Sequence, residues 1–94
     1  MEIIWTKPAL GDIEDIKQFI AKDSPYYAEK YTEKIITQTE KLKKFPKIGR
    51  ILPEEKKENL RELIFGNYRI IYLLAENEIV IIAIAHTRRD LKNI

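Results

Sequence analysis

Residues 60–91 read LRELIFGNYRIIYLLAENEIVIIAIAHTRRDL, the most apolar stretch of the chain. β-Branched and aromatic residues dominate three runs of strand length within it, 60–65, 68–74 and 79–85. Gly66-Asn67 separates the first two runs, and both residues tolerate the positive φ angles of a two-residue hairpin loop. The polar residues 75–78 provide the second reversal. The stretch therefore predicts a three-stranded antiparallel meander.

A two-residue loop at Gly66-Asn67 fixes the expected pairing of the strands. In the first hairpin Phe65 then faces Tyr68, and Arg61 faces Tyr72. In the second hairpin, the expected pairs are Tyr72 with Ile81, Ile70 with Ala83 and Arg69 with Ile84, with His86 beside Asn67.

Alternation along the strands divides the side chains between two faces. One face is expected to carry Glu62, Ile64, Arg69, Ile71, Leu73, Val80, Ile82, Ile84 and His86. The other is expected to carry Arg61, Leu63, Phe65, Tyr68, Ile70, Tyr72, Ile81, Ala83 and Ala85. Both faces are more apolar than a sheet with one side in water requires. We therefore expect helices to cover one face and a partner to meet part of the other, unless the last residues of the chain fold back over it.

The composition limits the chemistry of the chain. Its 94 residues suffice for a single domain, 1–94, in which 45% of residues are hydrophobic and 34% are charged. The absence of cysteine excludes disulfides, and one histidine is too few for a zinc site, so we expect no metal and no cofactor. The start MEIIWTKP lacks the features of a signal peptide and no apolar run could span a bilayer, so we expect a cytoplasmic protein without a membrane role.

The N-terminal half predicts a short strand and two helices. Residues 2–6 read as an edge strand for the meander, and Pro8 opens a helix that ends near Lys22. Ser24 caps a second helix, which meets no breaker before Pro46. The expected apolar stripes are Leu10, Ile13, Ile16, Phe19 and Ile20 on the first helix, and Ala28, Tyr31, Ile35 and Leu42 on the second. The link between the helices is so short that they form an antiparallel hairpin, which covers one face of the sheet.

The remaining segments are connections. Residues 45–50 predict a turn, residues 53–58 a mobile charged loop, and residues 90–94 a short terminal turn or helix.

Several short motifs, in this order, carry a resemblance to a known family. They include Trp5 before the first helix, Phe45-Pro46 followed by Gly49-Arg50, the strand YRIIY at 68–72 and the ending HTRRD at 86–90. In these motifs the chain resembles the RelE/ParE superfamily, the toxins of type II toxin–antitoxin pairs. The resemblance covers nearly the whole chain. It implies an α+β fold, with a helical hairpin packed on an antiparallel sheet, and growth arrest by the free protein.

The resemblance also implies an antitoxin partner that wraps a segment over the toxin. The excess of apolar residues on the sheet agrees with this, and we expect the antitoxin-binding face to include Ile71, Leu73, Val80 and Ile82.

The superfamily divides by target. RelE-like members cut messenger RNA on the ribosome with basic residues and sometimes a C-terminal tyrosine, whereas ParE-like members poison DNA gyrase. Here Arg69 and Arg88 match arginines of the RelE-type site. Leu60 and Glu62, however, stand where that site has lysines, and Ile94 stands at the tyrosine position. The long helix at 24–44 and the HTRRD ending favour the ParE-like branch, in which no catalytic residue is required.

Several residues have both a functional and a structural interpretation. The expected target contacts are Arg61, Arg69, His86, Arg88 and Arg89. In the alternative, a ribosome-dependent endoribonuclease, Arg69 and Arg88 would hold phosphate while His86 or Glu62 moved protons. The structural interpretations are an ion pair between Arg69 and Glu62, a stack of Arg61 on Tyr72, and a hydrogen-bonding role for His86 at a strand end. A third possibility is a binding module with the toxin fold and no activity.

Overall fold

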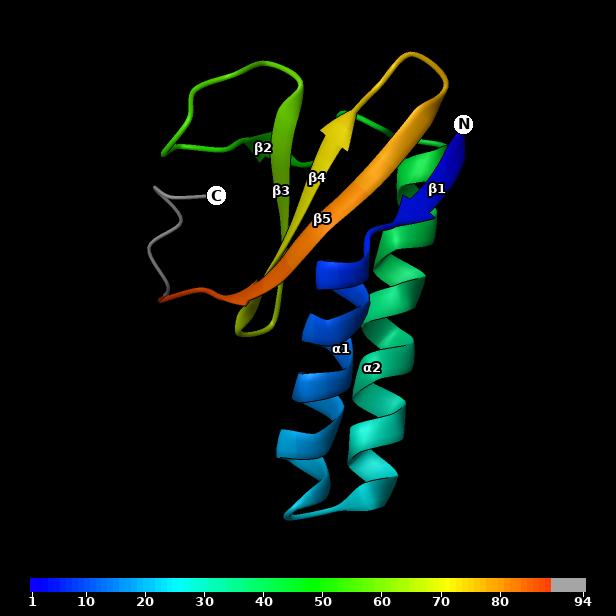
Figure 1. Ribbon diagram of the computed structural model, residues 1–94, viewed down its shortest axis with the longest axis vertical. Helices are drawn as coiled ribbons and strands as arrows, with labels where there is room; N and C mark the ends of the chain where they lie inside the picture. The colour runs from blue at the N-terminus through cyan, green and yellow to red at the C-terminus, as the bar shows by residue number, and fades with distance from the viewer. Residues whose placement is uncertain (89–94) are drawn as a thin grey trace.

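The computed structural model describes residues 1–88, which form a five-stranded sheet and a helical hairpin (Figure 1). The strands are β1 (Glu2–Trp5), β2 (Arg50–Ile51), β3 (Leu60–Phe65), β4 (Tyr68–Leu74) and β5 (Glu78–His86). Their order across the sheet is β1-β5-β4-β3-β2, with β1 parallel to β5 and all other neighbours antiparallel. The expected α+β class is confirmed, as are the meander and its added N-terminal edge strand. The terminal turn expected at 90–94 lies outside the described residues.

The register of the first hairpin is the expected one, with Phe65 opposite Tyr68 and Arg61 opposite Tyr72. The loop residue Gly66 has a φ of 58°, a left-handed conformation that favours glycine.

The register of the second hairpin is only partly as expected, because the pairing slips by one residue between Ile71 and Tyr72. Tyr72 pairs with Ile81 as expected, but Ile71 pairs with Ala83, so Ile82 is the extra residue of a β-bulge. Beyond the bulge the pairs are Ile70 with Ile84, Arg69 with Ala85 and Tyr68 with His86. The three pairs expected in this part of the hairpin were therefore wrong by one residue. The shift exchanges the faces of β5. Ile84 joins the core under the helices, while Ala83 and Ala85 lie on the other side.

The helices are α1 (Lys7–Ala21) and α2 (Pro25–Glu40), and α2 continues as the 3₁₀ turn η1 (Lys41–Lys43). Thr6 and Ser24 cap them, each accepting a hydrogen bond at 3.2 Å from an amide in the first turn. Each helix also has a proline in its first turn, where a missing N–H costs nothing. At its C-terminal end, α2 stops at Glu40 and η1 at Lys43, so the helical segment ends before Pro46, the first helix breaker in the sequence.

The buried face of α1 is centred on Ala9 and Ile16, with Ile13 and Ile20 packed beside them. Leu10 and Phe19, expected in the apolar stripe, lie at the margins of this face and are 51% and 65% exposed. On α2 the expected Ala28 and Ile35 are buried, and Tyr31 is partly buried against the core. Leu42, also expected, is buried in η1. Thr39 is also buried, and its hydroxyl donates to the Ile36 carbonyl at 2.6 Å.

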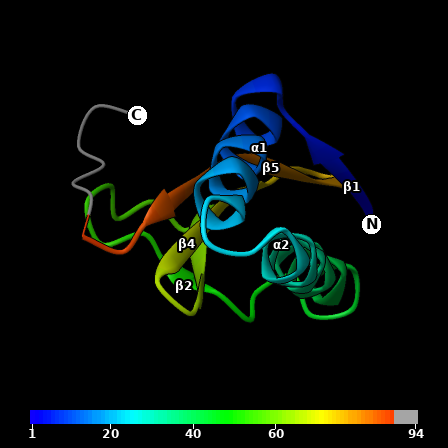
Figure 2. The ribbon, with the colours of Figure 1, turned by 90° about the horizontal axis from the view of Figure 1, so that it is seen from below.

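The main core lies between the hairpin and the sheet, and Trp5 packs against its edge. Figure 2 looks along the hairpin and shows the two helices side by side, with α1 over β5. The Asp12 carboxylate accepts a hydrogen bond at 2.9 Å from the Ile84 amide, which ties α1 to β5 beyond the bulge. The buried members of this core are Ala9, Ile16, Ile35, Leu42, Ile70, Tyr72, Ile79, Ile81 and Ile84. Each large aliphatic one contributes about 1.5 to 3 kcal/mol through burial.

The opposite side of the sheet, called the outer face below, carries a second core. Leu52 is wholly buried there against Leu60, Ile71 and Ala85. The chain segment between β2 and β3 thus covers the β3 side of the outer face.

Candidate functional site

Four charged side chains form a linked cluster on the outer face. Arg69 on β4 donates through Nε to Glu62 on β3, and through Nη1 and Nη2 to the two carboxylate oxygens of Glu54 at 2.8 and 2.7 Å. The second oxygen of Glu62 accepts a hydrogen bond from Nε of Arg50. We call these four residues, Arg50, Glu54, Glu62 and Arg69, the ion cluster. The expected cross-strand pair of Arg69 with Glu62 is confirmed.

Three members of the ion cluster are withdrawn from water, whereas the Arg50 side chain is 65% exposed. The side chain of Glu62 is fully buried, and those of Arg69 and Glu54 are 7% and 16% exposed. Buried charges are tolerated only when they are paired, and here two guanidinium groups balance two carboxylates. Hydrogen bonding to Glu54 raises the pKa of Arg69, burial opposes this, and Glu62 adds to the rise. Arg69 is thus a permanent cation whose donors are engaged by carboxylates.

Arg61, on β3 beside the edge strand β2, has a structural role. Its Nη1 donates to the Gly49 carbonyl at 2.9 Å, and its Nε donates to the Glu58 carbonyl at 3.1 Å. The guanidinium thus links the loop before β2 to the loop before β3. Within residues 1–88, every cation–π contact has a lysine as its cation. The expected stack on Tyr72 is therefore not formed.

Tyr72 fastens the loop before β2 to the sheet. Its ring is buried, and its hydroxyl accepts from the Gly49 amide at 3.0 Å and donates to the Pro46 carbonyl at 2.9 Å. Burial raises the pKa of Tyr72, although the Gly49 hydrogen bond and the charge of Arg61 oppose the rise. A Cβ at Gly49 would come within 2.5 Å of the Glu62 carbonyl oxygen, so this close approach requires glycine.

His86 and Arg88 lie exposed at the end of β5. The His86 ring contacts the edge of Tyr68 at a centroid distance of 5.8 Å, and its Nδ1 accepts from the Arg88 amide at 3.2 Å. His86 is therefore opposite Tyr68, not beside Asn67 and Arg69, because the bulge reverses the faces of β5. The Asn67 carbonyl instead accepts from the Thr87 amide at 2.8 Å. Arg89 lies outside the described residues.

The expected antitoxin-binding residues divide into two groups. Ile71 is wholly buried in the core with Leu52. Leu73, Val80 and Ile82 are half-buried, and Ile82 is the bulge residue. Cross-strand pairing places Leu73 and Val80 in an apolar row across four strands, Leu60–Leu73–Val80–Ile4, which we call the outer row.

Three residues of this region carry no sequence signal that would place them in the ion cluster or in the core. Arg50 and Glu54 lie 12 and 8 positions before Glu62, so no strand or helix periodicity links them to it. Leu52 lies between the expected turn at 45–50 and the expected charged loop at 53–58, so no pattern marks it as a core residue. The pairing of Glu54 with Arg69 also shows that this loop is fastened at one point, which its composition did not indicate.

Within residues 1–88, no group of His, Asp and Glu side chains is arranged to hold a metal ion. No helix in that part of the chain is long and apolar enough to cross a membrane.

Comparison with known proteins identifies the family of the chain. The family model described as "ParE toxin of type II toxin-antitoxin system, parDE" matches residues 3–91. The chain belongs to this ParE toxin family. "Toxin RelE2" of Caulobacter vibrioides is 30% identical to the ParE-family chain over 89 residues, which cover 94% of the chain and 97% of that protein. The expected membership of the RelE/ParE superfamily is thus confirmed, and the protein is a toxin of a type II toxin–antitoxin system.

A solved structure confirms the fold of this ParE-family toxin. The structure titled "Chromosomal ParDE TA system from P. aeruginosa" matches with a TM-score of 0.77 at 24% identity. The match covers 92% of this chain and 95% of that one.

Proposed function

We propose that this ParE-family toxin arrests growth by poisoning DNA gyrase, and that a cognate antitoxin neutralises it. The observation that carries the choice of target is the ion cluster. Poisoning requires a surface that binds the gyrase–DNA complex, whereas RNA cleavage requires cations that are available to a phosphate and groups that move protons.

The ion cluster argues against the second requirement. At the positions where RelE-like nucleases have lysines, this chain has the buried residues Leu60 and Glu62. Arg69, which matches the nuclease arginine, has a two-point contact with Glu54 where a phosphate would bind. An RNA phosphate would have to displace that carboxylate. No catalytic residue is therefore assigned.

The proposed target surface comprises the basic end of β5 and the helical hairpin. His86 and Arg88 are exposed there, and Arg89 continues the basic sequence. Arginine forms two-point contacts with phosphates and carboxylates, so this end fits either DNA or an acidic protein surface.

The proposed antitoxin contact comprises Leu73 and Val80 of the outer row together with the neighbouring bulge residue Ile82. Their half-buried apolar side chains provide a surface that an apolar segment would cover. The solved neighbour is titled as a ParDE toxin–antitoxin system, which supports a partner of this type.

A cleavage assay tests the choice of gyrase. The purified toxin is incubated with DNA gyrase, ATP and supercoiled plasmid, and the enzyme is then denatured and digested with protease. Linear plasmid that depends on both toxin and gyrase is the expected product. A reaction without gyrase is the control for nuclease contamination.

The absence of linear plasmid, with a folded and monodisperse toxin, would overturn the gyrase proposal. Translating ribosomes with a defined message, read by primer extension, then distinguish the remaining alternatives. Cleavage in the A site would identify an endoribonuclease, and the absence of cleavage would identify a binding module with the toxin fold.

A further inference from the structure

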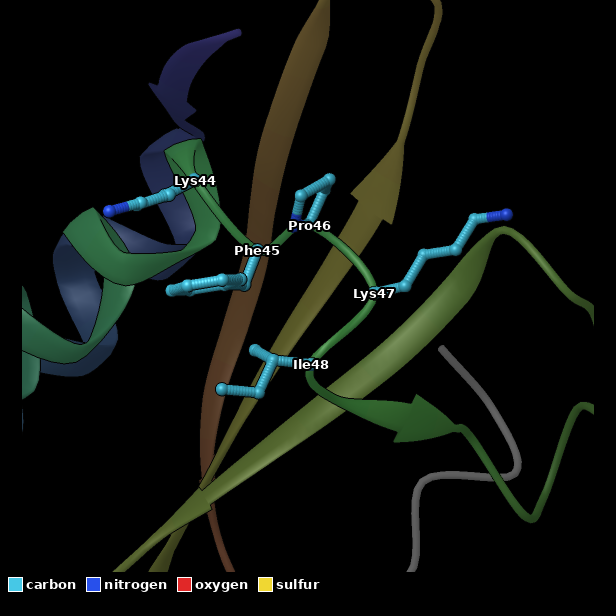
Figure 3. A pocket seen from close by; sticks show the side chains of 5 residues that line it. All are labelled: Lys44, Phe45, Pro46, Lys47 and Ile48. Atoms are coloured by element: carbon cyan, nitrogen blue, oxygen red, sulfur yellow. The ribbon is translucent and has the colours of Figure 1, made fainter.

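An open apolar groove lies on the loop that follows η1. It has a volume of about 520 Å³, and Lys44, Phe45, Pro46, Lys47 and Ile48 line it. Phe45 and Ile48 are 54% and 52% exposed. Figure 3 shows their side chains on the same side of the loop, while Lys44 and Lys47 extend away from each other. Two large apolar side chains kept half in water indicate a binding surface.

The loop that forms the groove is fixed before any ligand arrives. The buried hydroxyl of Tyr72 bonds the backbone at both Pro46 and Gly49, and Arg61 bonds the Gly49 carbonyl. The Ile48 amide also donates to the Phe45 carbonyl at 3.1 Å. A pre-organised site loses less conformational entropy on binding, so each contact made there contributes more to affinity.

The charge around the groove is positive. Residues 41–47 read KLKKFPK, with four lysines in seven positions. Lys43 pairs with Glu40 at 2.8 Å, whereas the ammonium group of Lys44 lies 5.7 Å from the centre of the Phe45 ring. In the described part of the chain, Lys44 and Lys47 form no ion pair with a carboxylate. An acidic ligand would therefore meet two uncompensated cations.

Lys47 also lines a second hollow of about 300 Å³, together with Glu58, Asn59 and Leu74. The groove at Phe45 and Ile48 is open, so it fits a side chain presented by an extended or helical peptide.

We propose that this groove binds an acidic segment of the antitoxin, whose bulky apolar side chain inserts between Phe45 and Ile48. Carboxylates on either side of that anchor pair with Lys44 and Lys47. This inference rests on the proposed pairing of the toxin with an antitoxin. It adds a second contact, at the end of α2, to the one on the outer row.

Binding measurements with the purified cognate antitoxin test the inference. Phe45→Ala and the double change Lys44→Glu/Lys47→Glu each weaken binding about tenfold or more, as expected for an aromatic anchor and its charged neighbours. The matched controls are Phe19→Ala and Lys22→Glu/Lys30→Glu. Phe19 is 65% exposed and Lys22 lies 5.9 Å from its ring centre, so the controls change a similar aromatic–lysine pair that is not among the residues lining this groove.

Photo-crosslinking identifies the occupant. A benzoylphenylalanine in place of Phe45 is expected to crosslink to an antitoxin segment rich in Asp and Glu around an aromatic or leucine side chain. The same substitution at Phe19 provides the background.

The outcomes separate the inference from the proposed function. If the antitoxin binds tightly and both groove variants have affinities within about twofold of wild type, the inference is overturned while the proposed pairing stands. A crosslink to a basic segment, or to a second copy of the toxin, also overturns it. If the antitoxin does not bind the folded wild-type toxin, the pairing fails and the inference fails with it.

Discussion

Glu54 holds Arg69 through two hydrogen bonds of 2.7 and 2.8 Å, in the fork geometry by which an arginine binds a carboxylate or a phosphate. Glu62 binds the remaining Nε of the same guanidinium. The residue that most resembles a nuclease arginine is therefore part of the architecture that fastens the loop at 53–58 to the sheet. Stability measurements can test that role without an activity assay.

Removal of the central carboxylate should destabilise the fold. Glu62→Ala leaves Arg50 without its partner and Arg69 with Glu54 as the carboxylate it retains in the cluster. Because the side chain of Glu62 is fully buried, the expected loss of unfolding free energy is about 3 kcal/mol. Urea denaturation measures the loss. The control Glu58→Ala removes an exposed carboxylate, and a similar loss there would show that the effect is not specific to the ion cluster.

Tyr72 should make the stability of the fold decrease at high pH. The folded state raises the pKa of Tyr72 above that of the unfolded chain, so the tyrosine contributes stability below the unfolded value of about 10. That contribution is lost as pH rises through the folded-state pKa. Tyr72→Phe should cost about 1 to 3 kcal/mol at neutral pH, because it leaves the Gly49 amide and the Pro46 carbonyl without a partner.

Urea denaturation of wild type and Tyr72→Phe at a series of pH values measures both effects. Part of the alkaline decrease should persist in the variant, since burial also raises the pKa of Tyr68. If the difference in unfolding free energy between the two proteins stays constant above pH 9, the proposed titration of Tyr72 is contradicted.

Two glycine substitutions should act in opposite directions. A Cβ at Gly49 would lie 2.5 Å from the Glu62 carbonyl oxygen and 2.6 Å from the Tyr72 hydroxyl, so Gly49→Ala should cost about 1 to 3 kcal/mol. At Gly11, in α1, a Cβ would meet no atom within 4 Å, so Gly11→Ala should stabilise by about 0.5 to 1 kcal/mol. Thermal unfolding of both variants measures the difference. If Gly49→Ala raised the melting temperature as much as Gly11→Ala, the loop at Gly49 would be able to adapt to the extra methyl group.

The sequence predicts the elements of this fold better than the way they meet. The turn at Gly66-Asn67 fixes the first hairpin because a two-residue loop allows one register. The bulge at Ile82 was not predictable, since every position from 79 to 85 is apolar and alternation gives no sign of an inserted residue. Because the prediction lacked this bulge, it placed His86 on the wrong face of the sheet.

The ion cluster was predicted only in part, for a related reason. Arg69 and Glu62 lie on paired strands, so register brings them together. Glu54 and Arg50 reach the same point from a loop and from a two-residue strand, and no local pattern encodes that approach.

The basic end of β5 should determine gyrase poisoning. Arg88→Ala is expected to reduce linear plasmid about fivefold or more, because it removes a candidate contact to DNA or to an acidic protein surface. The main-chain bond from Arg88 to His86 survives the change, so the fold should be unaffected. Lys57→Ala removes an exposed cation from the charged loop and is the control. A decrease of the same size in both variants would indicate a general charge effect, and no decrease in either would place the target contact elsewhere.

Antitoxin binding should depend on the apolar character of the outer row. Val80 lies at its centre, paired with Leu73 on one side and Ile4 on the other, and it is half-buried in the free chain. Val80→Thr keeps the shape of the side chain but places a hydroxyl where an apolar segment would cover it, and burying a hydroxyl without a partner costs about 1 to 3 kcal/mol. The expected result is antitoxin binding about tenfold weaker, measured by calorimetry, with little change in the stability of the free toxin. Ile36→Thr, at a residue 44% exposed on α2, makes a comparable change outside the outer row and should leave affinity unchanged. If Val80→Thr binds as tightly as wild type while the groove variants do not, the antitoxin engages the end of α2 and leaves the outer row free.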